Sequence, residues 1–395
     1  MLTDPYFLKK KKKGKEMPTR EEGEMSSLLC SPAAPLDLDD LLSEILLRLP
    51  PQPSSLPRAS AVCRRWRNLA SDPGFSRRFR RHHRRNPPLL GCFMRYGQQI
   101  HFQPTLEPPN RVPPARFSFP MEAINRHFCL LGCRHGLLLI SHTFQGTPEL
   151  LVWDPVSGHQ HRLRIPPVFG ENTPAQAAVL RATLGDTHHF KVVLVSADER
   201  NARVFGCVYS SETRVWGNII STPASDLSLT VVDPSKPAVL VGDSIYMLLL
   251  GKSASIVKFD VHRQSLAVIP LPICSNTDCS RYYSVMRADG GGLGFLFVSF
   301  SDCTIQLWKR NTGSNGVVDS WVLARTIQLE KLLPIYSENR SDLLLQGFAE
   351  ENNVVFLWMF LRLFMVQLDS LQVTKLPDIW FPCCHPFEGV YAAGI

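Results

Sequence analysis

A strand–turn–strand phrase that recurs about every 50 residues is the feature that most limits how this chain folds. In three segments, 151–166, 256–272 and 364–377, an apolar strand is followed by a turn and then by a second strand that ends at a proline. Weaker copies lie at 204–216 and 305–321. The equivalent positions in the five copies are Trp153, Tyr209, Phe259, Trp308 and Leu368. Successive positions are 56, 50, 49 and 60 residues apart. Regular spacing of this kind indicates a domain built from similar units.

Each copy also has an apolar strand upstream of it. These strands lie at 136–140, 190–195, 239–250, 293–300 and 343–348. Two hairpins per repeat make a four-stranded blade, and blades stacked around an axis hide most of their strand edges. We therefore expect five β-propeller blades of kelch-type length, and 89–102 together with 390–395 could complete a sixth. The alternative, a pair of β-sandwiches, has no need of a repeat near 50 residues.

The N-terminal quarter differs from the rest in charge. Residues 1–95 hold 19 Lys and Arg against 10 Asp and Glu, whereas the remainder holds 24 against 25. The densest part is an arginine run made of Arg77, Arg78, Arg80, Arg81, Arg84 and Arg85. The run belongs to no groove-reading motif, which disfavours nucleic-acid binding. A solvated helical end, or a contact with an acidic protein partner, fits the run better.

Apolar spacing between residues 37 and 70 predicts helices. One helix over 37–49 carries leucines and an isoleucine at offsets 0, 3, 4, 7, 8 and 11, with aspartates at its start and Pro50 after it. A second helix begins after Ser54 and Ser55 and continues to Asp72. Two helices of this size fall near the ~40-residue limit below which a domain needs disulfides, metal or a partner. Part of the leucine stripe should therefore be buried by another protein, although docking onto the chain's own large domain is an alternative.

The same region resembles the F-box motif, especially that of plant F-box proteins. The resemblance is carried by Leu-Leu-Ser-Glu-Ile-Leu-Leu-Arg-Leu-Pro at 41–50, by Val-Cys-Arg-Arg-Trp-Arg-Asn-Leu at 62–69, and by Asp-Pro-Gly-Phe at 72–75. Members of that family bind the small Skp-type adaptor of a cullin-based ubiquitin ligase. The resemblance implies that the adaptor-facing surface, or the core beneath it, comprises Leu38, Leu41, Leu42, Ile45, Leu46, Leu49, Pro50, Val62 and Trp66. The family usually opens with Leu-Pro where this chain has Asp37-Leu38, so the first adaptor contact is in doubt.

The repeat region resembles the F-box-associated, kelch-like β-propeller that follows the F-box in plant proteins. The expected fold is therefore α+β and multidomain, with a small all-α F-box before a large all-β propeller-like domain. We expect a tail at 1–35, the F-box at 36–80, a basic linker at 81–95 and the propeller at 96–395. The tail carries Lys9–Lys13, which could serve as a nuclear import signal, and Met25 could be the native start.

No recognisable set of catalytic, cofactor or metal-binding residues occurs in the sequence. The eleven cysteines lack a CxxC pair, so we expect reduced thiols, no metal and no cofactor. The glycine-rich segment 290–294 lacks the Lys-Ser/Thr of a phosphate loop and predicts a hairpin turn. The longest apolar stretch, 354–368, has 15 residues and contains Arg362, too short for the ~20 apolar residues of a membrane span. The N-terminus also lacks a secretory signal, so we expect a cytoplasmic or nuclear protein without membrane contact.

Two classes of function remain. In the first, the chain is a non-enzymatic substrate receptor of an SCF-type ubiquitin ligase, and the propeller recruits a target protein for ubiquitination. In the second, it is a stand-alone propeller binding module or enzyme with an accessory helical N-terminus. The helical stripe that needs a partner favours the first. Loops at 168–176, 221–227, 274–281 and 311–317 are candidates for target binding by length and polarity alone.

Overall fold

The computed structural model describes most of the chain from residue 39 onward. The described residues are 39–124, 127–170, 175–181, 189–198, 201–224, 231–232, 236–250, 254–272, 282–299, 301–311, 320–333, 343–359, 361–377 and 384–391. The chain divides into two units, Met1–Leu42 and Ser43–Ile395. The expected tail at 1–35 lies outside the described residues, as do Asp37 and Leu38.

Four helices precede the first strand of the described chain, namely α1 (Asp39–Leu47), α2 (Ser55–Ser60), α3 (Arg64–Ser71) and α4 (Pro73–His82). The single helix expected after Ser54 was wrong: Cys63 has an extended backbone with φ −160° and ψ 170°, which ends one helix and starts the next. Helix α4 was missed because Asp72-Pro73 was interpreted only as a stop. The Asp72 carboxylate caps α4 by accepting a 2.6 Å hydrogen bond from the amide of Phe75.

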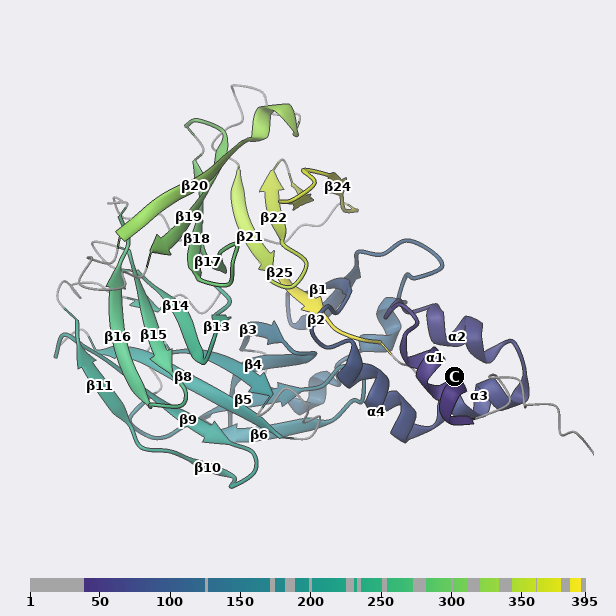
Figure 1. Cartoon of the computed structure of the whole chain (residues 1–395). Coiled ribbons are helices and arrows are strands. Elements are labelled where there is room, and N and C mark those ends of the chain that lie inside the picture. The colour runs from purple at the N-terminus through teal and green to yellow at the C-terminus, as the bar shows by residue number, and fades with distance from the viewer. Residues whose placement is uncertain are drawn as a thin grey trace, which may run out of the picture. The chain divides into compact units, whose positions relative to one another are not determined.

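The remaining described chain is β-rich and forms six antiparallel sheets (Figure 1). The sheet that joins the two ends of the domain contains β1 (Leu89–Tyr96), β2 (Gln99–Pro104) and β25 (Cys384–Glu388). The next two sheets contain β3 (Phe128–Arg134), β4 (Leu137–Phe144), β5 (Thr147–Trp153) and β6 (Gln160–Arg164), then β7 (Ala175–Arg181), β8 (Phe190–Asp198), β9 (Arg203–Ser210), β10 (Val215–Trp216) and β11 (Ile220–Pro223).

The other three sheets follow in chain order. They contain β12 (Val231–Val232), β13 (Val239–Val241), β14 (Ser244–Leu250), β15 (Ser255–Asp260) and β16 (Ser265–Pro270); β17 (Tyr283–Arg287), β18 (Leu293–Ser299), β19 (Thr304–Asn311) and β20 (Ser320–Gln328); and β21 (Leu344–Ala349), β22 (Val354–Met359), β23 (Arg362–Gln367) and β24 (Val373–Lys375). In the described chain, short 3₁₀ helices lie at Pro114–Phe117, Met121–Ala123 and Leu329–Lys331.

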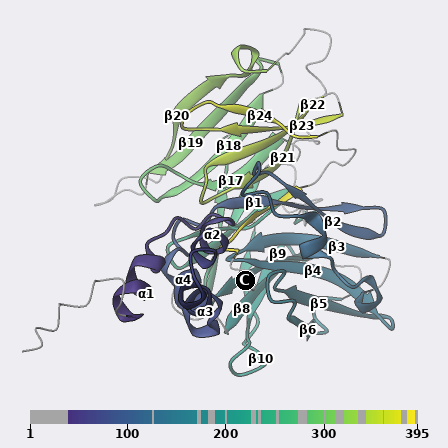
Figure 2. The ribbon, with the colours of Figure 1, turned by 90° about the vertical axis from the view of Figure 1, so that its right-hand side faces the viewer.

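The six sheets form the blades of a propeller, because each sheet contacts the next in a closed ring. The second and third blades meet through β8 with β12 and β11 with β16, and innermost strands make the other contacts. Strand β3 contacts β7, β13 contacts β17, β17 contacts β21, and β25 contacts both β21 and β3. The views in Figures 1 and 2 both place β1 and β2 beside β3 and β4. Strand β25 is thus the C-terminal strand that closes a blade begun by β1 and β2.

The core lies between adjacent blades, in six apolar clusters, one for each interface. Consecutive residues of a strand therefore serve opposite neighbours: Val192 and Leu194 of β8 face one cluster, and Val193 and Val195 face another. This two-sided burial explains why the strands are apolar at nearly every position instead of alternating. The apolar stretch at 354–368 is β22 and β23 with their flanking residues.

The propeller with six blades confirms the expected fold class. The repeat points Trp153, Tyr209, Phe259 and Trp308 lie in the third strands of their blades, and Leu368 directly follows β23. The closing strand lies at Cys384–Glu388, however, not at the expected 390–395, of which 392–395 fall outside the described residues. The apolar Cys384 and Phe387 of β25 enter two different clusters, so this strand has neighbours on both faces.

The segment 81–95, expected as a basic linker, contains the end of α4, a short connection and most of β1. Strand β1 belongs to the closing blade because it pairs with β2 on one edge and with β25 on the other. The glycine-rich segment forms the predicted hairpin turn between β17 and β18. Gly290 and Gly291 have φ of 87° and 88°, which glycine adopts without strain.

Candidate functional site

The apolar side chains of α1 divide into an exposed pair and a buried pair. Leu41 and Ile45 are 44% and 40% exposed, whereas Leu42 and Leu46 are fully buried. A spacing of four residues places the two members of each pair on the same face of the helix. The α1 stripe is therefore partly core and partly surface.

The other residues of the predicted adaptor-binding set are also divided. Val62, in the turn between α2 and α3, is 62% exposed, and Pro50 is exposed as well. Leu49 and Trp66 are half-buried, and Leu38 lies outside the described residues. The exposed members are the ones available to a partner, and the buried Leu42 and Leu46 belong to the core beneath.

Polar contacts join the second half of α1 to α4. The Arg78 guanidinium donates to the Ser43 hydroxyl at 3.0 Å and pairs with the Glu44 carboxylate at 2.7 Å. His83 Nε2 donates to the Leu47 carbonyl oxygen at 2.8 Å, which places the proton of the neutral ring on Nε2. Burial lowers the pKa of His83 and outweighs the opposing effect of this hydrogen bond.

A second candidate site lies at one end of the propeller channel. All innermost strands run in the same direction along the channel, so their C-terminal ends meet at one mouth. Charged residues occupy these ends: Arg134 ends β3, Arg181 ends β7, Arg287 ends β17, Glu350 follows β21 and Glu388 ends β25.

Two ion pairs lie at this mouth, one buried and one partly exposed. The Arg134 guanidinium pairs with the Glu350 carboxylate through two hydrogen bonds and donates a third to the Ala238 carbonyl oxygen. Arg287 pairs with Glu351 at 3.3 Å. Arg134 and Glu350 are each less than one tenth exposed, so little water competes with their hydrogen bonds. The two residues are 216 positions apart in the sequence, and their pairing links two different blades.

His135 and Asp154 position Arg181 on the other side of the mouth. The Arg181 amide donates to His135 Nδ1 at 3.2 Å, and its guanidinium lies 3.5 Å from the Asp154 carboxylate. Burial lowers the pKa of His135 well below its ordinary value, and the positive charges of Arg134, Arg84, Arg181 and Arg287 lower it further. His135 is therefore neutral in a strongly cationic environment.

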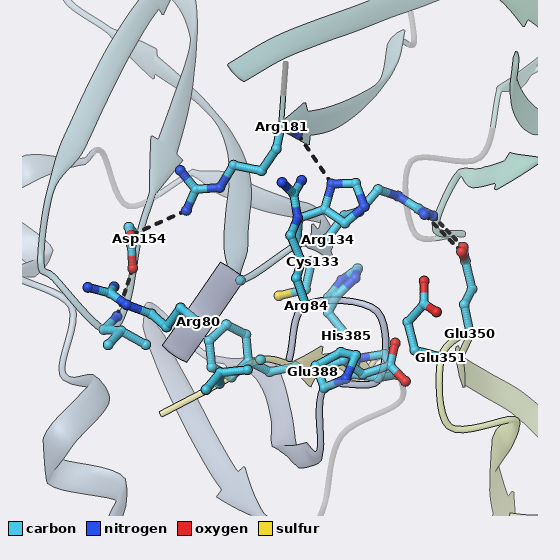
Figure 3. A pocket seen from close by; sticks show the side chains of 18 of the residues that line it. Arg80, Arg84, Cys133, Arg134, Asp154, Arg181, Glu350, Glu351, His385 and Glu388 are labelled. Atoms are coloured by element: carbon cyan, nitrogen blue, oxygen red, sulfur yellow. Dashed lines mark hydrogen bonds and ion pairs between the residues drawn. The ribbon is translucent and has the colours of Figure 1, made fainter. Parts of the chain in front are cut away.

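A cavity of about 120 Å³ accessible to water occupies this mouth (Figure 3). Arg80, Arg81 and Arg84, from α4 and the turn after it, line the cavity together with the propeller residues. In Figure 3, Arg181 and Arg80 lie on the side of Asp154, and Glu350 and Glu351 lie opposite.

Two buried titratable groups also line the cavity. Burial raises the pKa of Glu388 to about 7, although the Asn352 amide and side chain each donate a 2.8 Å hydrogen bond to its carboxylate. Burial lowers the pKa of His385 to about 4. Neither histidine of the cavity carries a charge at neutral pH, and Glu388 is partly protonated there.

The propeller sequence matches the family model described as "F-box protein AT5G49610-like, beta-propeller" over residues 129–387, more than half of the chain. The chain belongs to this F-box β-propeller family. Residues 39–82 match a second model, described as F-box-like, and these residues span α1 to α4. Both halves of the resemblance that the sequence indicated are thereby confirmed, although the matches show neither a plant origin nor a kelch type.

No curated protein sequence matches the chain significantly. Solved structures that resemble it include TolB from Acinetobacter baumannii, with 14% identity, TM-score 0.36, and coverage of 78% of this chain and 69% of TolB. A Lactobacillus plantarum protein has 10% identity, TM-score 0.40, and coverage of 73% and 81%. The Dos1 propeller has 9% identity, TM-score 0.35, and coverage of 73% and 67%. Likenesses at these values carry no inference about the function of this F-box β-propeller protein.

No described residue of the four predicted target-binding loops lines the cavity. Segment 274–281 lies outside the described residues, as do 312–317, 225–227 and 171–174. The cavity was not predicted from sequence, although one signal was present: Arg134, Arg181 and Arg287 each directly end an apolar strand. Within the described chain, no cluster of three potential metal ligands occurs, and no helix is long and apolar enough to cross a membrane.

Proposed function

We propose that this F-box β-propeller protein is a substrate-receptor subunit of a cullin-based, SCF-type ubiquitin ligase, in the cytoplasm, the nucleus or both. The helical segment docks on the Skp-type adaptor, and the propeller recruits a target protein. The observation that carries the proposal is the exposure of Leu41, Ile45 and Val62 within a segment that matches the F-box-like family.

Physical reasoning supports a partner at this surface. Exposed aliphatic side chains gain about 1.5–3 kcal/mol each when they become fully buried, so a partner that covers three of them gains substantial binding energy. The chain itself then has no chemistry to perform. It raises the local concentration of target lysines near a ubiquitin thioester that other subunits carry.

The test is co-purification of the full chain with a Skp-type adaptor. Replacing Leu41 and Ile45 together by alanine removes contacts worth ~4–10 kcal/mol if both are buried by the adaptor, which corresponds to at least about a thousandfold weaker binding. A matched control is Val322→Ala with Leu323→Ala in β20, because these residues are 38% and 43% exposed. The control variant should bind the adaptor normally.

Equal adaptor binding by the wild type and the Leu41/Ile45 variant would contradict the proposal. Failure of the wild-type chain to bind any Skp-type adaptor would instead favour the alternative, a stand-alone propeller binding module or enzyme. A ubiquitination assay with the assembled ligase then identifies targets by comparing the full chain with a chain lacking residues 36–80.

A further inference from the structure

The helical segment at 43–88 is far more basic than its own carboxylates can balance. It contains eleven arginines, no lysine and two carboxylates, those of Glu44 and Asp72. Both carboxylates are engaged, because Glu44 pairs with Arg78 and Asp72 caps α4. Nine of the eleven positive charges therefore have no carboxylate of this segment to balance them, and adaptor binding through apolar side chains leaves them unexplained.

Three of these arginines, in α4 and just after it, are exposed to solvent. The guanidinium groups of Arg77, Arg81 and Arg85 make no hydrogen bond or ion pair within the part of the chain that the structure describes. Their neighbour Arg80 differs, because its Nε donates to the Ser76 carbonyl oxygen at 3.4 Å. The first three side chains are therefore available to another molecule.

Arg77 and Arg81 form a stripe on the side of α4 that faces away from its core. Phe75 and Phe79 are the buried residues of α4, and each arginine comes two positions after one of them, which is about half a helical turn. The two arginines lie about 6 Å apart along the helix axis. Like charges four positions apart repel each other and weaken a helix slightly, so the folding of α4 does not account for the stripe.

The stripe leads toward the part of the propeller that contains the channel mouth. Arg81 lines the cavity at this mouth, whereas Arg77, one helical turn earlier, does not. A protein that is bound on the propeller at the mouth can therefore reach the stripe with an extended segment.

The chemistry of the stripe favours carboxylates as its ligands. The planar guanidinium binds a carboxylate through two parallel hydrogen bonds and is less strongly hydrated than the lysine ammonium, so arginine without lysine is typical of a binding surface. In an extended polypeptide, side chains at alternate positions point the same way and are about 6–7 Å apart, which matches the spacing of the two arginines. Nucleic acid fits less well, because Phe75 and Phe79 are buried and cannot stack on bases.

We propose that Arg77, Arg81 and Arg85 bind an acidic segment of the protein that the propeller recruits. The identity of this protein as the recruited target rests on the proposed function. The surface formed by these three arginines then acts as a second recruiting surface, and it selects targets that carry carboxylates at alternate positions of an extended segment.

The first test measures binding of a fluorescein-labelled oligoglutamate to the purified full chain by fluorescence anisotropy, with an oligoglutamine of equal length for comparison. Oligoglutamate should bind and oligoglutamine should not. Arg77→Gln with Arg81→Gln should weaken binding about three- to thirtyfold, because each exposed pair of arginine and carboxylate contributes modestly. Arg77→Lys with Arg81→Lys, which keeps the charges without the planar forks, should give an intermediate affinity.

A matched control removes the same charge from the propeller. Arg214→Gln with Arg263→Gln changes two exposed positions and should weaken binding by less than about twofold, because salt screens distant charges. Circular dichroism of each variant checks that it is folded. Equal losses in the control and in the α4 variant would show that oligoglutamate responds only to net charge, and this result would overturn the inference.

The second test asks whether the stripe recruits a substrate. In the assembled ligase, a lysine-bearing oligoglutamate should be ubiquitinated faster than a lysine-bearing oligoglutamine, and Arg77→Gln with Arg81→Gln should remove the difference. Equal rates for the two peptides with the wild-type chain would contradict a role in recruitment.

Two competition results would also overturn the inference. Tighter binding of duplex DNA than of oligoglutamate would assign the arginines to nucleic acid, and loss of oligoglutamate binding in the presence of the Skp-type adaptor would assign them to the adaptor. The α4 variant should still co-purify with the adaptor. Failure of the wild-type chain to bind any adaptor would contradict the proposed function, whereas failure of the free chain to bind oligoglutamate would contradict this inference alone.

Discussion

In the propeller, each sheet has a neighbour on both faces, and consecutive residues of β8 are buried on opposite sides. In the helical segment, α1 buries Leu42 and Leu46 and exposes Leu41 and Ile45. Both regions are rich in leucine and other aliphatic residues. The difference lies in closure: a ring of six blades supplies a neighbour to both faces of each sheet, whereas one side of α1 stays exposed.

Stability and partner binding should therefore depend on different regions of the chain. Substitutions in the propeller should act on folding, because its apolar and charged contacts are internal and cross between blades. Substitutions on the exposed side of α1 should act on a partner.

Glu350→Gln should cause the largest loss of stability. The substitution leaves the Arg134 guanidinium buried without its carboxylate, and breaking a buried pair in this way costs about 3–5 kcal/mol. The measurement is the free energy of unfolding from urea titration. Glu212→Gln, at an exposed position of the same domain, is the control and should change the free energy by less than about 0.5 kcal/mol. Similar effects of both substitutions would show that the charged mouth does not contribute to ring closure.

Leu46→Ala and Ile45→Ala compare neighbouring residues of α1. Leu46 is fully buried, so its truncation should reduce the free energy of unfolding by about 2–5 kcal/mol. Ile45 is 40% exposed, so its truncation should cost clearly less in the chain alone. Ile45→Ala should nevertheless weaken adaptor binding, although this variant remains stably folded. If Ile45→Ala destabilised the chain as much as Leu46→Ala, the exposed side of α1 would be part of the core.

The fold was predictable from sequence largely because the third strands of the blades repeat a recognisable phrase. Trp153, Tyr209, Phe259 and Trp308 lie in those strands, and their spacing predicted the repeat. The predicted upstream strands correspond mostly to second strands such as β4, β8 and β18. The first strands β3, β7 and β17 were missed, and these are the ones that line the channel.

The missed strands explain why the cavity could not be predicted. Arg134 and Glu350 are 216 residues apart and meet only because the ring closes, which no local pattern encodes. The arginine run was visible, but the helix that presents it was not, since Asp72-Pro73 both ends α3 and begins α4. The residues predicted to bind the adaptor, by contrast, all lie between Leu38 and Trp66, and their spacing is itself the motif.

Glu388→Gln should change the pH dependence of stability. Burial raises the pKa of Glu388 from 4.5 to about 7, so the folded chain holds a proton that the unfolded chain releases between these values. Stability contributed by this group is therefore lost as pH rises from about 4.5 to 7, on the order of 3 kcal/mol in total. The variant, whose amide oxygen still accepts the hydrogen bonds from Asn352, should gain stability over the wild type across this range.

The measurement for Glu388 is the difference in free energy of unfolding between the variant and the wild type at pH 5, 6, 7 and 8. Taking this difference cancels the contribution of His385, which is the same in both proteins. With its pKa of about 4, His385 makes the folded chain more stable as pH rises toward 6.5, which is opposite to the effect of Glu388. His135, which burial also keeps neutral, cancels in the same way. A difference that stays constant with pH would mean that Glu388 is ionised in the folded chain throughout.

The smallest expected effect concerns the ion pair between Arg78 and Glu44. Both side chains are about half exposed, so a double-mutant cycle with Arg78→Ala and Glu44→Ala should give a coupling energy of about 0.2–1 kcal/mol. Salt should reduce it further, because exposed charges are screened within ~10 Å at 0.1 M ionic strength. Arg78→Ala alone should cost somewhat more than Glu44→Ala, since Arg78 also donates to the buried Ser43 hydroxyl. A coupling energy above about 2 kcal/mol that persists at high salt would contradict this expectation. The Arg78–Glu44 pair would then stabilise the fold as the Arg134–Glu350 pair does, and charged contacts would matter as much for α1 as for the propeller.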